Sequence, residues 1–382
     1  MFQSGSPVKG KDFIDRKKHL PLFKSYLDNN QHIMIKAPRR FGKTSLIKHM
    51  FDYEKGYDFI YIDIRLHHSL DSLSKQIVDS AYSFVKIENF IRQTKNSLLK
   101  LLKSIKTISI PDMAEVTIDL VSKESDPIEL FIHSLNVVDS IATSKGANIK
   151  VIFDEFQDIT KLYDKNILEV LRSVAQHHEN ITYVFLGSIE SIMTEIFESK
   201  ASPFFHFASV IKLDGLDADE LFDYTKTEFD KQGIVYDAEL LRSTITFLEG
   251  HPEYSAKVLQ TLYINAMLEK KPIDYSSALE AISFRVIENR AYLDELIAKL
   301  KSKKHHFEVV YEMANNLSHD VDSATLYNTR VSLENMGLIA KLQKGEYKIV
   351  DIFLKILLQQ HDDKMVALEG RLDIGLEYDY EK

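Results

Sequence analysis

The sequence predicts an α/β fold in which helices cover both faces of a parallel sheet, followed by a helical segment and a small mixed segment. Short apolar runs alternate with amphipathic helical patterns over residues 30–213, as in parallel sheets buried between helices. Residues 217–300 are helical in pattern throughout, with breaks near Gly233 and Gly250. Residues 305–361 follow the order helix, helix, strand pair, helix, which is typical of a winged helix-turn-helix.

Five short apolar runs are expected to form the sheet, because strands buried on both faces lack polar alternation. They are residues 32–36, 59–64, 149–153, 182–186 and 210–213. Helices are expected where apolar residues recur three and four positions apart. They are residues 21–27, 43–51, 70–106, 127–144, 164–179 and 189–197. Alternating residues between 107 and 121, around Pro111 and Asp112, predict a hairpin inserted between helices.

Length and composition limit the class of protein. At about 150 residues per domain, 382 residues indicate two or three domains, and 45% hydrophobic residues suffice for sizeable cores. No run approaches the ~18 apolar residues of a membrane helix, and the start has no apolar signal-peptide core. We therefore expect a cytoplasmic protein with no membrane contact. Zero cysteines exclude disulfides, a thiol nucleophile and a thiolate zinc site.

Charge is unevenly distributed along the chain. The formal net charge is -9, a poor match to a protein that coats nucleic acid. Residues 1–56 nevertheless contain 12 Lys/Arg against 5 Asp/Glu. A basic N-terminal segment on an acidic chain predicts a local anionic ligand.

The phosphate-loop pattern [AG]-x4-G-K-[ST] occupies residues 37–44, between a predicted strand and a predicted helix. The backbone N–H groups of such a loop and the dipole of the following helix favour phosphate. Lys43 adds a mobile positive charge, and the Thr44 hydroxyl can ligate Mg²⁺. Ala37 replaces the usual first glycine. If that position required a positive φ, its Cβ would cost about 1–2 kcal/mol, so we expect an altered loop that still binds phosphate.

Two carboxylates follow the apolar strand 149–153. Ligands of open α/β sheets bind at the carboxyl edge, where Asp154 can hold Mg²⁺ and Glu155 can act as general base on water. An apolar strand ending in two acids is by itself often only a strand end. The phosphate loop upstream on the same sheet favours the functional interpretation.

Ser188 follows the strand 182–186 and has two interpretations. Its hydroxyl could contact the γ-phosphate or orient water, which would make it a catalytic residue. It could equally cap the helix 189–197. Both interpretations stay open at this point.

Together these motifs resemble the archaeal-type ATPase family, prokaryotic members of the STAND branch of AAA+ proteins. The resemblance rests on residues 13–16, the loop 37–45, Asp-Glu-Phe-Gln at 154–157, Gly187-Ser188, and Gly-His-Pro at 250–252. It implies a P-loop NTPase fold of the AAA+ kind with ATP and Mg²⁺ as cofactors. It also implies catalytic roles for Glu155, Lys43 and Ser188, and a metal site at Thr44 and Asp154.

The resemblance further implies which residues hold the nucleotide. They are Phe13, Ile14, Arg16, Ala37, Pro38, Arg39, Arg40, Phe41, Gly42, Lys43, Thr44, Ser45, His251 and Pro252. The implied domains are a P-loop domain 1–214 with an insertion at about 67–125, a helical lid 215–300, a winged-helix domain 301–361 and an acidic tail 362–382.

One departure from the family bears on activity. Members often carry Gly-Arg after Ser-Pro-[Leu/Phe]-[Tyr/Phe], and that arginine is a candidate finger for the γ-phosphate, whereas here residues 202–205 are followed by His206 and Phe207. Such an arginine is worth roughly 10³–10⁵ in rate, so we expect slow or partner-stimulated hydrolysis.

Two functions fit these observations. The first is an ATPase switch, in which nucleotide state sets the position of the lid and winged helix for a protein partner or for self-association. The second is a DNA-handling ATPase, similar to initiators or transposition helpers. Residues 300–360 carry 8 Lys/Arg and 7 Asp/Glu, which gives little phosphate neutralisation, so DNA is possible but not favoured.

Overall fold

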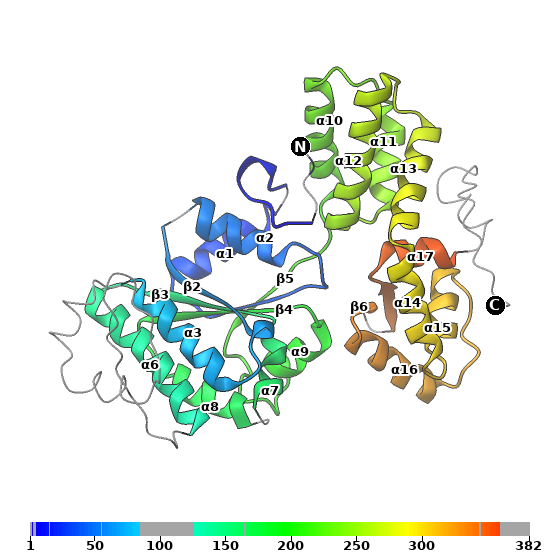
Figure 1. The fold of residues 1–382 in the computed structure, drawn as a ribbon. Coiled ribbons are helices and arrows are strands. Elements are labelled where there is room, and N and C mark those ends of the chain that lie inside the picture. The colour runs from blue at the N-terminus through cyan, green and yellow to red at the C-terminus, as the bar shows by residue number, and fades with distance from the viewer. Residues whose placement is uncertain are drawn as a thin grey trace.

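The computed structural model describes residues 2, 5–14, 16–54, 56–84, 126–163, 166–343 and 345–359. It contains a five-stranded parallel sheet in the order β2-β3-β4-β1-β5, which confirms the predicted α/β class (Figure 1). The strands are β1 Ile33–Lys36, β2 Asp58–Asp63, β3 Ile149–Asp154, β4 Ile181–Gly187 and β5 Ser209–Lys212.

Helices cover both faces of the sheet. Helices α1 (His19–Asp28) and α2 (Lys43–Lys48) lie on one face, and α3 (Leu70–Tyr82), α6 (Pro127–Lys145) and α8 (Asn166–Ala175) on the other (Figure 1). Because alternate residues of a strand face opposite sides, Ile33 and Ile35 pack with α1 and α2, and Met34 packs in the other layer. Shorter elements complete this part: η1 Gly10–Asp12, η2 His49–Glu54, η3 Ile64–Leu66, η4 Phe156–Asp158, α7 Ile159–Leu162 and α9 Glu190–Glu198.

The segment 67–125, predicted as an insertion, begins with a helix of the main layer. Leu73, Ile77 and Ala81 of α3 are buried in the same core as the sheet. The remainder of the predicted helix 70–106 and the predicted hairpin at 107–121 lie outside the described residues, as does the acidic tail 362–382.

The second part of the chain is helical, as predicted. Its helices are α10 Ala218–Lys231, α11 Ala238–Phe247, α12 Pro252–Glu269, α13 Tyr275–Glu288 and α14 Arg290–Lys301. The order predicted for residues 305–361 is also observed: α15 His306–Ala314, α16 Ser323–Asn335, the antiparallel pair β6 Ile339–Gln343 and β7 Glu346–Ile349, and α17 Ile352–Leu358. No helix in the described ranges is both long and apolar enough to cross a membrane.

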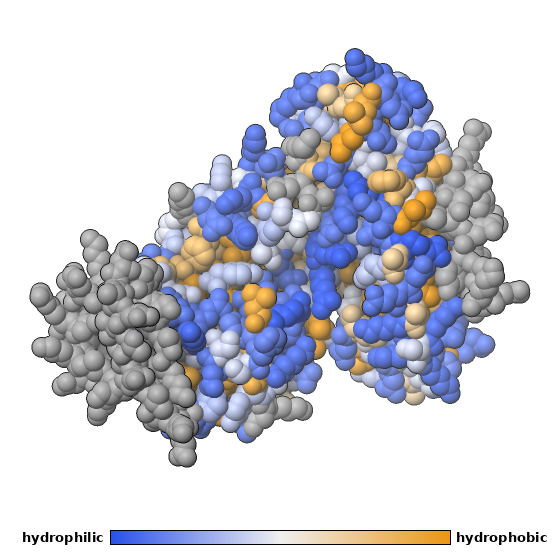
Figure 2. Space-filling model, in the orientation of Figure 1, coloured by the Kyte–Doolittle hydropathy of each residue, from blue (hydrophilic) through white to orange (hydrophobic). Residues whose placement is uncertain are grey.

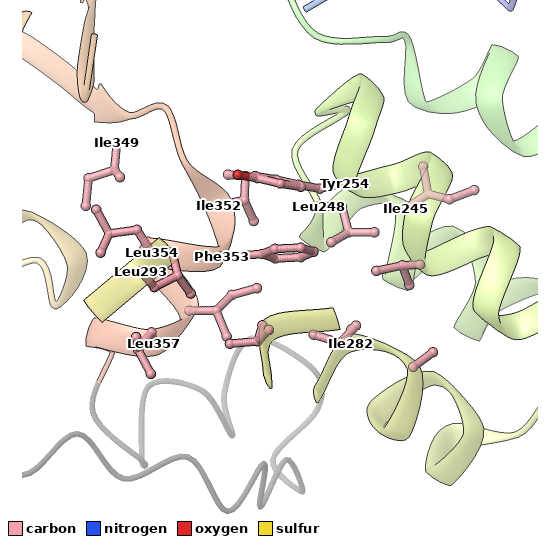
Figure 3. Close-up of a cluster of buried hydrophobic side chains, with 14 of the residues drawn as sticks. Ile245, Leu248, Tyr254, Ile282, Leu293, Ile349, Ile352, Phe353, Leu354 and Leu357 are labelled. Carbon is pink, nitrogen blue, oxygen red and sulfur yellow. The ribbon is translucent and has the colours of Figure 1, made fainter. Parts of the chain in front are cut away.

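One hydrophobic core runs through this second part. It joins buried residues of α10–α13, such as Ile245 and Ile282, to residues of α14–α17, such as Leu293 and Leu357 (Figure 3). At its centre the Tyr254 and Phe353 rings stack with centroids 4.0 Å apart. We call residues 216–359 the helical half and residues 5–214 the sheet half.

The two halves meet away from this core as well. Ser191 of α9 donates a hydrogen bond to Asn335 at the end of α16, and Ala340 and Val350 pack in the same cluster as α1 and α2 of the sheet half. Hydrophilic residues gather in the hollow between the halves (Figure 2).

Candidate active site

The β1–α2 loop adopts a turn with two left-handed residues. Arg40 has φ 66° and Gly42, immediately before α2, has φ 85°. Ala37 does not adopt a positive φ, so the strain considered for this alanine does not arise. The positive φ falls on Arg40, a residue type that adopts it only where the surrounding structure holds it there.

Lys43, the first residue of α2, is held by the loop itself. Its Nζ donates to the carbonyl oxygens of Ala37 at 2.8 Å and Pro38 at 2.9 Å. Burial lowers the pKa of Lys43 to about 8, against the attraction of Glu155 and Asp154. The side chain therefore keeps most of its positive charge at neutral pH, buried beside the loop.

Asp154 ends β3 and meets α2 across the sheet edge. Its Oδ2 accepts hydrogen bonds from Thr44 Oγ1 at 3.4 Å and from the Tyr61 hydroxyl of β2. Burial raises the pKa of Asp154, opposed by the hydrogen bond from Tyr61. A buried carboxylate beside a threonine hydroxyl is an oxygen donor set suited to Mg²⁺, which keeps several waters and needs few protein ligands. Across the described residues no cluster of three or more His, Asp or Glu side chains is arranged to hold a metal ion.

Glu155 is positioned by its backbone and by three side chains. Its φ of 52° turns the chain out of β3, a strained conformation often found at functional sites. Its Oε2 accepts from Ser188 Oγ at 2.6 Å and Gln157 Nε2 at 2.5 Å, and pairs with an Arg65 guanidinium nitrogen at 2.9 Å. A carboxylate fixed this tightly is oriented in advance for proton transfer.

The structure decides whether Ser188 caps the helix that follows it. Helix α9 begins at Glu190 with Ile189 as N-cap and without a side-chain cap, so the capping interpretation of Ser188 is wrong. The hydroxyl is buried and points to Glu155 instead. A Cβ at the neighbouring Gly187, the last residue of β4, would lie 2.2 Å from Met193 and 2.9 Å from Gln157, so a larger residue there would displace these two side chains.

Two adjoining cavities lie at this edge of the sheet. The loop cavity is lined by the β1–α2 loop, the two carboxylates and the start of α12: Gly5, Ser6, Pro7, Val8, Arg39, Arg40, Gly42, Lys43, Thr44, Ser45, Asp154, Glu155, Pro252 and Glu253. The apolar cavity is lined by Phe2, Val8, Asp12, Phe13, Ile14, Arg16, Gly42, Ser45, Leu216, Leu221, Tyr224, Pro252 and Ala256. They share Val8, Gly42, Ser45 and Pro252, so one ligand can occupy both.

The apolar cavity joins both halves of the molecule. Its lining comes from the N-terminal segment, from the start of α2 and from helices α10 and α12. Arg16 lines this cavity, and its guanidinium donates hydrogen bonds to the carbonyl oxygens of Phe41 at 2.8 Å and Asp214 at 2.7 Å. Phe13 stacks on His49 with centroids 4.2 Å apart. A charged cavity joined to an apolar one fits a ligand with phosphates at one end and a flat ring at the other.

Four of the expected ligand residues do not line either cavity. Ala37 and Pro38 act through the carbonyls that hold Lys43, and Phe41 is buried. His251 lies behind Phe41, with ring centroids 4.9 Å apart, and accepts a hydrogen bond from Tyr254 N at the start of α12. Burial first, and the charge of Arg40 second, lower the pKa of His251 to about 3, so its ring is neutral.

Sequence reasoning missed several residues of the site. Tyr61 and Arg65 contact the two carboxylates from β2 and from the turn after it. Arg65 was detectable, because it follows the carboxyl end of a predicted strand at the same sheet edge. Phe2 and Tyr224 carry no local signal, since they reach the apolar cavity only through the packing of the helical half.

The chain is similar to known proteins in sequence and in fold. A protein of 24% identity over 330 residues, covering 78% of this chain and 86% of the relative, is an uncharacterized ATP-binding protein of Methanocaldococcus jannaschii. The Walker-type ATPase PABY2304 of Pyrococcus abyssi has a similar fold, with TM-score 0.64 and 17% identity over 94% of this chain and 99% of that one. The Aeropyrum pernix ORC2 protein, described in ADPNP and ADP complexes, gives TM-score 0.49 and 13% identity over 93% and 95% of the two chains.

A family description matches most of the chain. The ATPase domain found predominantly in Archaea is recognised over residues 13–257, which include the loop, both carboxylates and the start of α12. The protein is thus an ATP-binding P-loop ATPase of the archaeal kind, and this chain belongs to the family of ATPase domains found predominantly in Archaea.

Proposed function

We propose that this protein is a Mg²⁺-dependent ATP-hydrolysing switch of the AAA+/STAND type, in which the nucleotide sets the position of the helical half relative to the sheet half. One observation carries the proposal: a continuous path of contacts runs from the β1–α2 loop into the core of the helical half.

The path begins at Arg40. Its Nε pairs with Glu253 at 3.2 Å, one of its terminal nitrogens lies 3.4 Å from the Tyr254 hydroxyl, and its guanidinium lies over the Tyr292 ring at 5.5 Å. A change in the loop on phosphate binding would therefore move groups on α12 and α14.

The path continues through Tyr254. Its hydroxyl donates to Asp351 at 2.6 Å, and its ring stacks between those of His251 and Phe353. Burial raises the pKa of Asp351, opposed by this hydrogen bond. Because α10–α17 share one core, the helical half would respond as a single body (Figure 3).

The hydrolytic roles follow from the site. Thr44 and Asp154 would hold Mg²⁺, which when bound offsets negative charge on the phosphates. Glu155, oriented by Ser188 and Gln157, would accept the proton of the attacking water. With His206 and Phe207 in place of the family's Gly-Arg, we propose slow or partner-stimulated turnover, which suits a switch whose output is a conformation.

DNA handling is the less favoured alternative. The single arginine of α16, Arg330, hydrogen-bonds His319 at 3.0 Å and lies over the Tyr347 ring. The C-terminal end of α16 contacts α9 of the sheet half. Using α16 on duplex DNA would require these contacts to be given up. A steep salt dependence of binding to duplex DNA would favour this alternative over a protein partner or self-association.

The test measures the distance between the halves. The chain contains no cysteine, so cysteines introduced at Ser173 of α8 and Leu268 of α12, both exposed, would take two labels specifically. The switch predicts different distances with saturating ADP and with a non-hydrolysable ATP analogue. Arg40→Ala should remove the difference, whereas Arg242→Ala, which removes an exposed arginine paired with Asp219, should preserve it.

Two results would contradict the switch. One is an identical distance with both nucleotides. The other is an unchanged response in Arg40→Ala at saturating nucleotide, with affinity measured in parallel to establish saturation.

A further inference from the structure

A third cavity adjoins the loop cavity, and the proposed function assigns no ligand to it. We call it the α14 cavity, and its charged lining residues are Arg39, Arg40, Glu295, Lys299 and Asp351. Its walls are the β1–α2 loop of the sheet half and, in the helical half, α14 and the ends of the β6–β7 pair. It shares the two arginines with the loop cavity, but the two carboxylates at the end of β3 and the start of α2 do not line it.

Two cations of the α14 cavity are available to a ligand. Arg39 and Lys299 are exposed, and neither side chain forms a hydrogen bond or an ion pair with any other described residue. The third cation, Arg40, is already paired with Glu253 through its Nε at 3.2 Å. Because the two free cations come from different halves, an anion in this cavity can be attracted by both at once.

The carboxylates of the cavity do not neutralise these two cations. Both oxygens of the buried Asp351 are engaged: Oδ2 accepts from the Tyr254 hydroxyl at 2.6 Å, and Oδ1 accepts from Leu354 N at 3.0 Å. Glu295 lies one turn before Lys299 on α14, yet its carboxylate forms no ion pair within the described part of the chain. The exposed ammonium and guanidinium groups are therefore left for a ligand.

The charges that act on one wall of the cavity are positive. His251 lines the cavity, and burial first and the charge of Arg40 second lower its pKa to about 3. Lys348 and Lys257 act on His251 in the same direction. A negatively charged group is favoured in such surroundings, and a positively charged one is disfavoured.

The types of cation indicate which anion fits. A guanidinium donates two parallel hydrogen bonds to phosphate, and an ammonium adds a compact point charge. A phosphate group has several oxygens that point in different directions, so it can accept from Arg39 in the loop and from Lys299 on α14 together. A single carboxylate has two oxygens in one plane and reaches cations on opposite walls less well.

We propose that the α14 cavity is a second anion site, which binds the phosphate group of a small phosphorylated molecule between Arg39 and Lys299. The inference goes beyond the proposed function, because this site lies outside the loop cavity and takes no part in hydrolysis. Its ligand contacts the sheet half through Arg39 and the helical half through Lys299, so binding stabilises one relative position of the halves.

The test fills the loop cavity first. The protein is saturated with Mg²⁺ and a non-hydrolysable ATP analogue, and binding of inorganic phosphate is then measured by titration calorimetry, with one phosphate expected per chain. Lys299→Ala should weaken phosphate binding by about tenfold or more, the value of one charged hydrogen bond, and Lys299→Arg should retain it. Lys304→Ala is the matched control, because this exposed lysine follows α14 and lines none of the three cavities.

Three results would overturn the second site. They are no phosphate binding to the loaded protein, equal phosphate affinities of Lys299→Ala and Lys304→Ala, and acetate binding as tight as phosphate binding. Each leaves the proposed function in place, because that function depends on the analogue, whose affinity Lys299→Ala should not change. Failure of the unmodified protein to bind the analogue would instead overturn the proposed function, and the two lysine variants titrated with phosphate alone would still decide the second site.

Discussion

The sheet half and the helical half contribute to the same site by different means. In the sheet half, short contiguous motifs place Lys43 at the start of α2, after the turn that follows β1, and Asp154 and Glu155 at the end of β3, and hydrogen bonds hold them at one edge of the sheet. The helical half provides Tyr224 and Pro252, which are positioned by a core that spans eight helices. We therefore expect substitutions in the sheet half to change chemistry, and substitutions in the helical half to change stability and position.

The largest effect is expected at Glu155. Glu155→Gln removes the proposed general base while the amide can still contact Ser188, so hydrolysis should fall by roughly 10²–10⁴ with ATP binding retained. Steady-state phosphate release and equilibrium nucleotide binding measure the two effects. Hydrolysis at the parental rate would contradict the assignment of Glu155. A large drop in melting temperature would contradict the expectation that substitutions in the sheet half change chemistry and leave stability unchanged.

Lys43 should come next. Lys43→Ala removes the buried ammonium beside the loop, and ATP affinity should fall by about a hundredfold, the value of a charged hydrogen bond or two. Titration with a fluorescent ATP analogue measures the change. Lys48→Ala, at the exposed end of the same helix, is the control and should bind normally. Equal ATP affinities of Lys43→Ala and Lys48→Ala would contradict the proposal that this loop binds the phosphates.

Tyr254 tests the helical half. Tyr254→Phe keeps the stacking with His251 and Phe353 but removes the hydroxyl that donates to Oδ2 of the buried Asp351 carboxylate, whose Oδ1 still accepts from Leu354 N. The loss of this buried hydrogen bond should cost about 1–3 kcal/mol of unfolding free energy. Chemical denaturation measures it. Tyr236→Phe removes a comparable hydroxyl from an exposed pair with Asp230 and should change stability by less than about 0.5 kcal/mol. A larger loss in Tyr236→Phe would show that burial does not decide the effect.

The smallest effect is a pH dependence common to both halves. Burial is the main cause that lowers the pKa of His251 to about 3 and that of His32, beside β4, to about 4, against 6.5 unfolded. Between these pKa values and 6.5 the two histidines bind protons in the unfolded chain but not in the folded chain. The free energy of unfolding therefore falls as the pH drops below about 6.5. Each histidine should contribute about 1.4 kcal/mol of loss by pH 5.5.

Variants of the two histidines can show how much of this loss of stability at low pH arises in each half. His251→Asn keeps a side-chain acceptor at the start of α12 and should reduce the loss between pH 7.5 and 5.5, as should His32→Asn in the sheet half. Denaturation midpoints at the two pH values provide the measurement. Unchanged pH dependence in both variants would mean that other groups cause it.

The sequence by itself determined the α/β class, the order of nearly all described elements, and the two motifs for which we propose phosphate and metal binding. These features depend on residues near one another in the chain: hydrophobic period, a glycine before α2, and polar residues at strand ends. Parallel pairing then brings strand ends to one edge, so Asp154 and the loop could be placed together in advance.

Tertiary structure decided the rest. That Ser188 orients Glu155 instead of capping α9, that Arg65 pairs with Glu155, and that Phe2 lines the same cavity as Tyr224 depend on contacts between residues distant in sequence. It also decided that the predicted lid and the C-terminal segment share one core. Hydrophobic packing is non-directional, so a sequence pattern specifies which faces are buried but not which partners they meet.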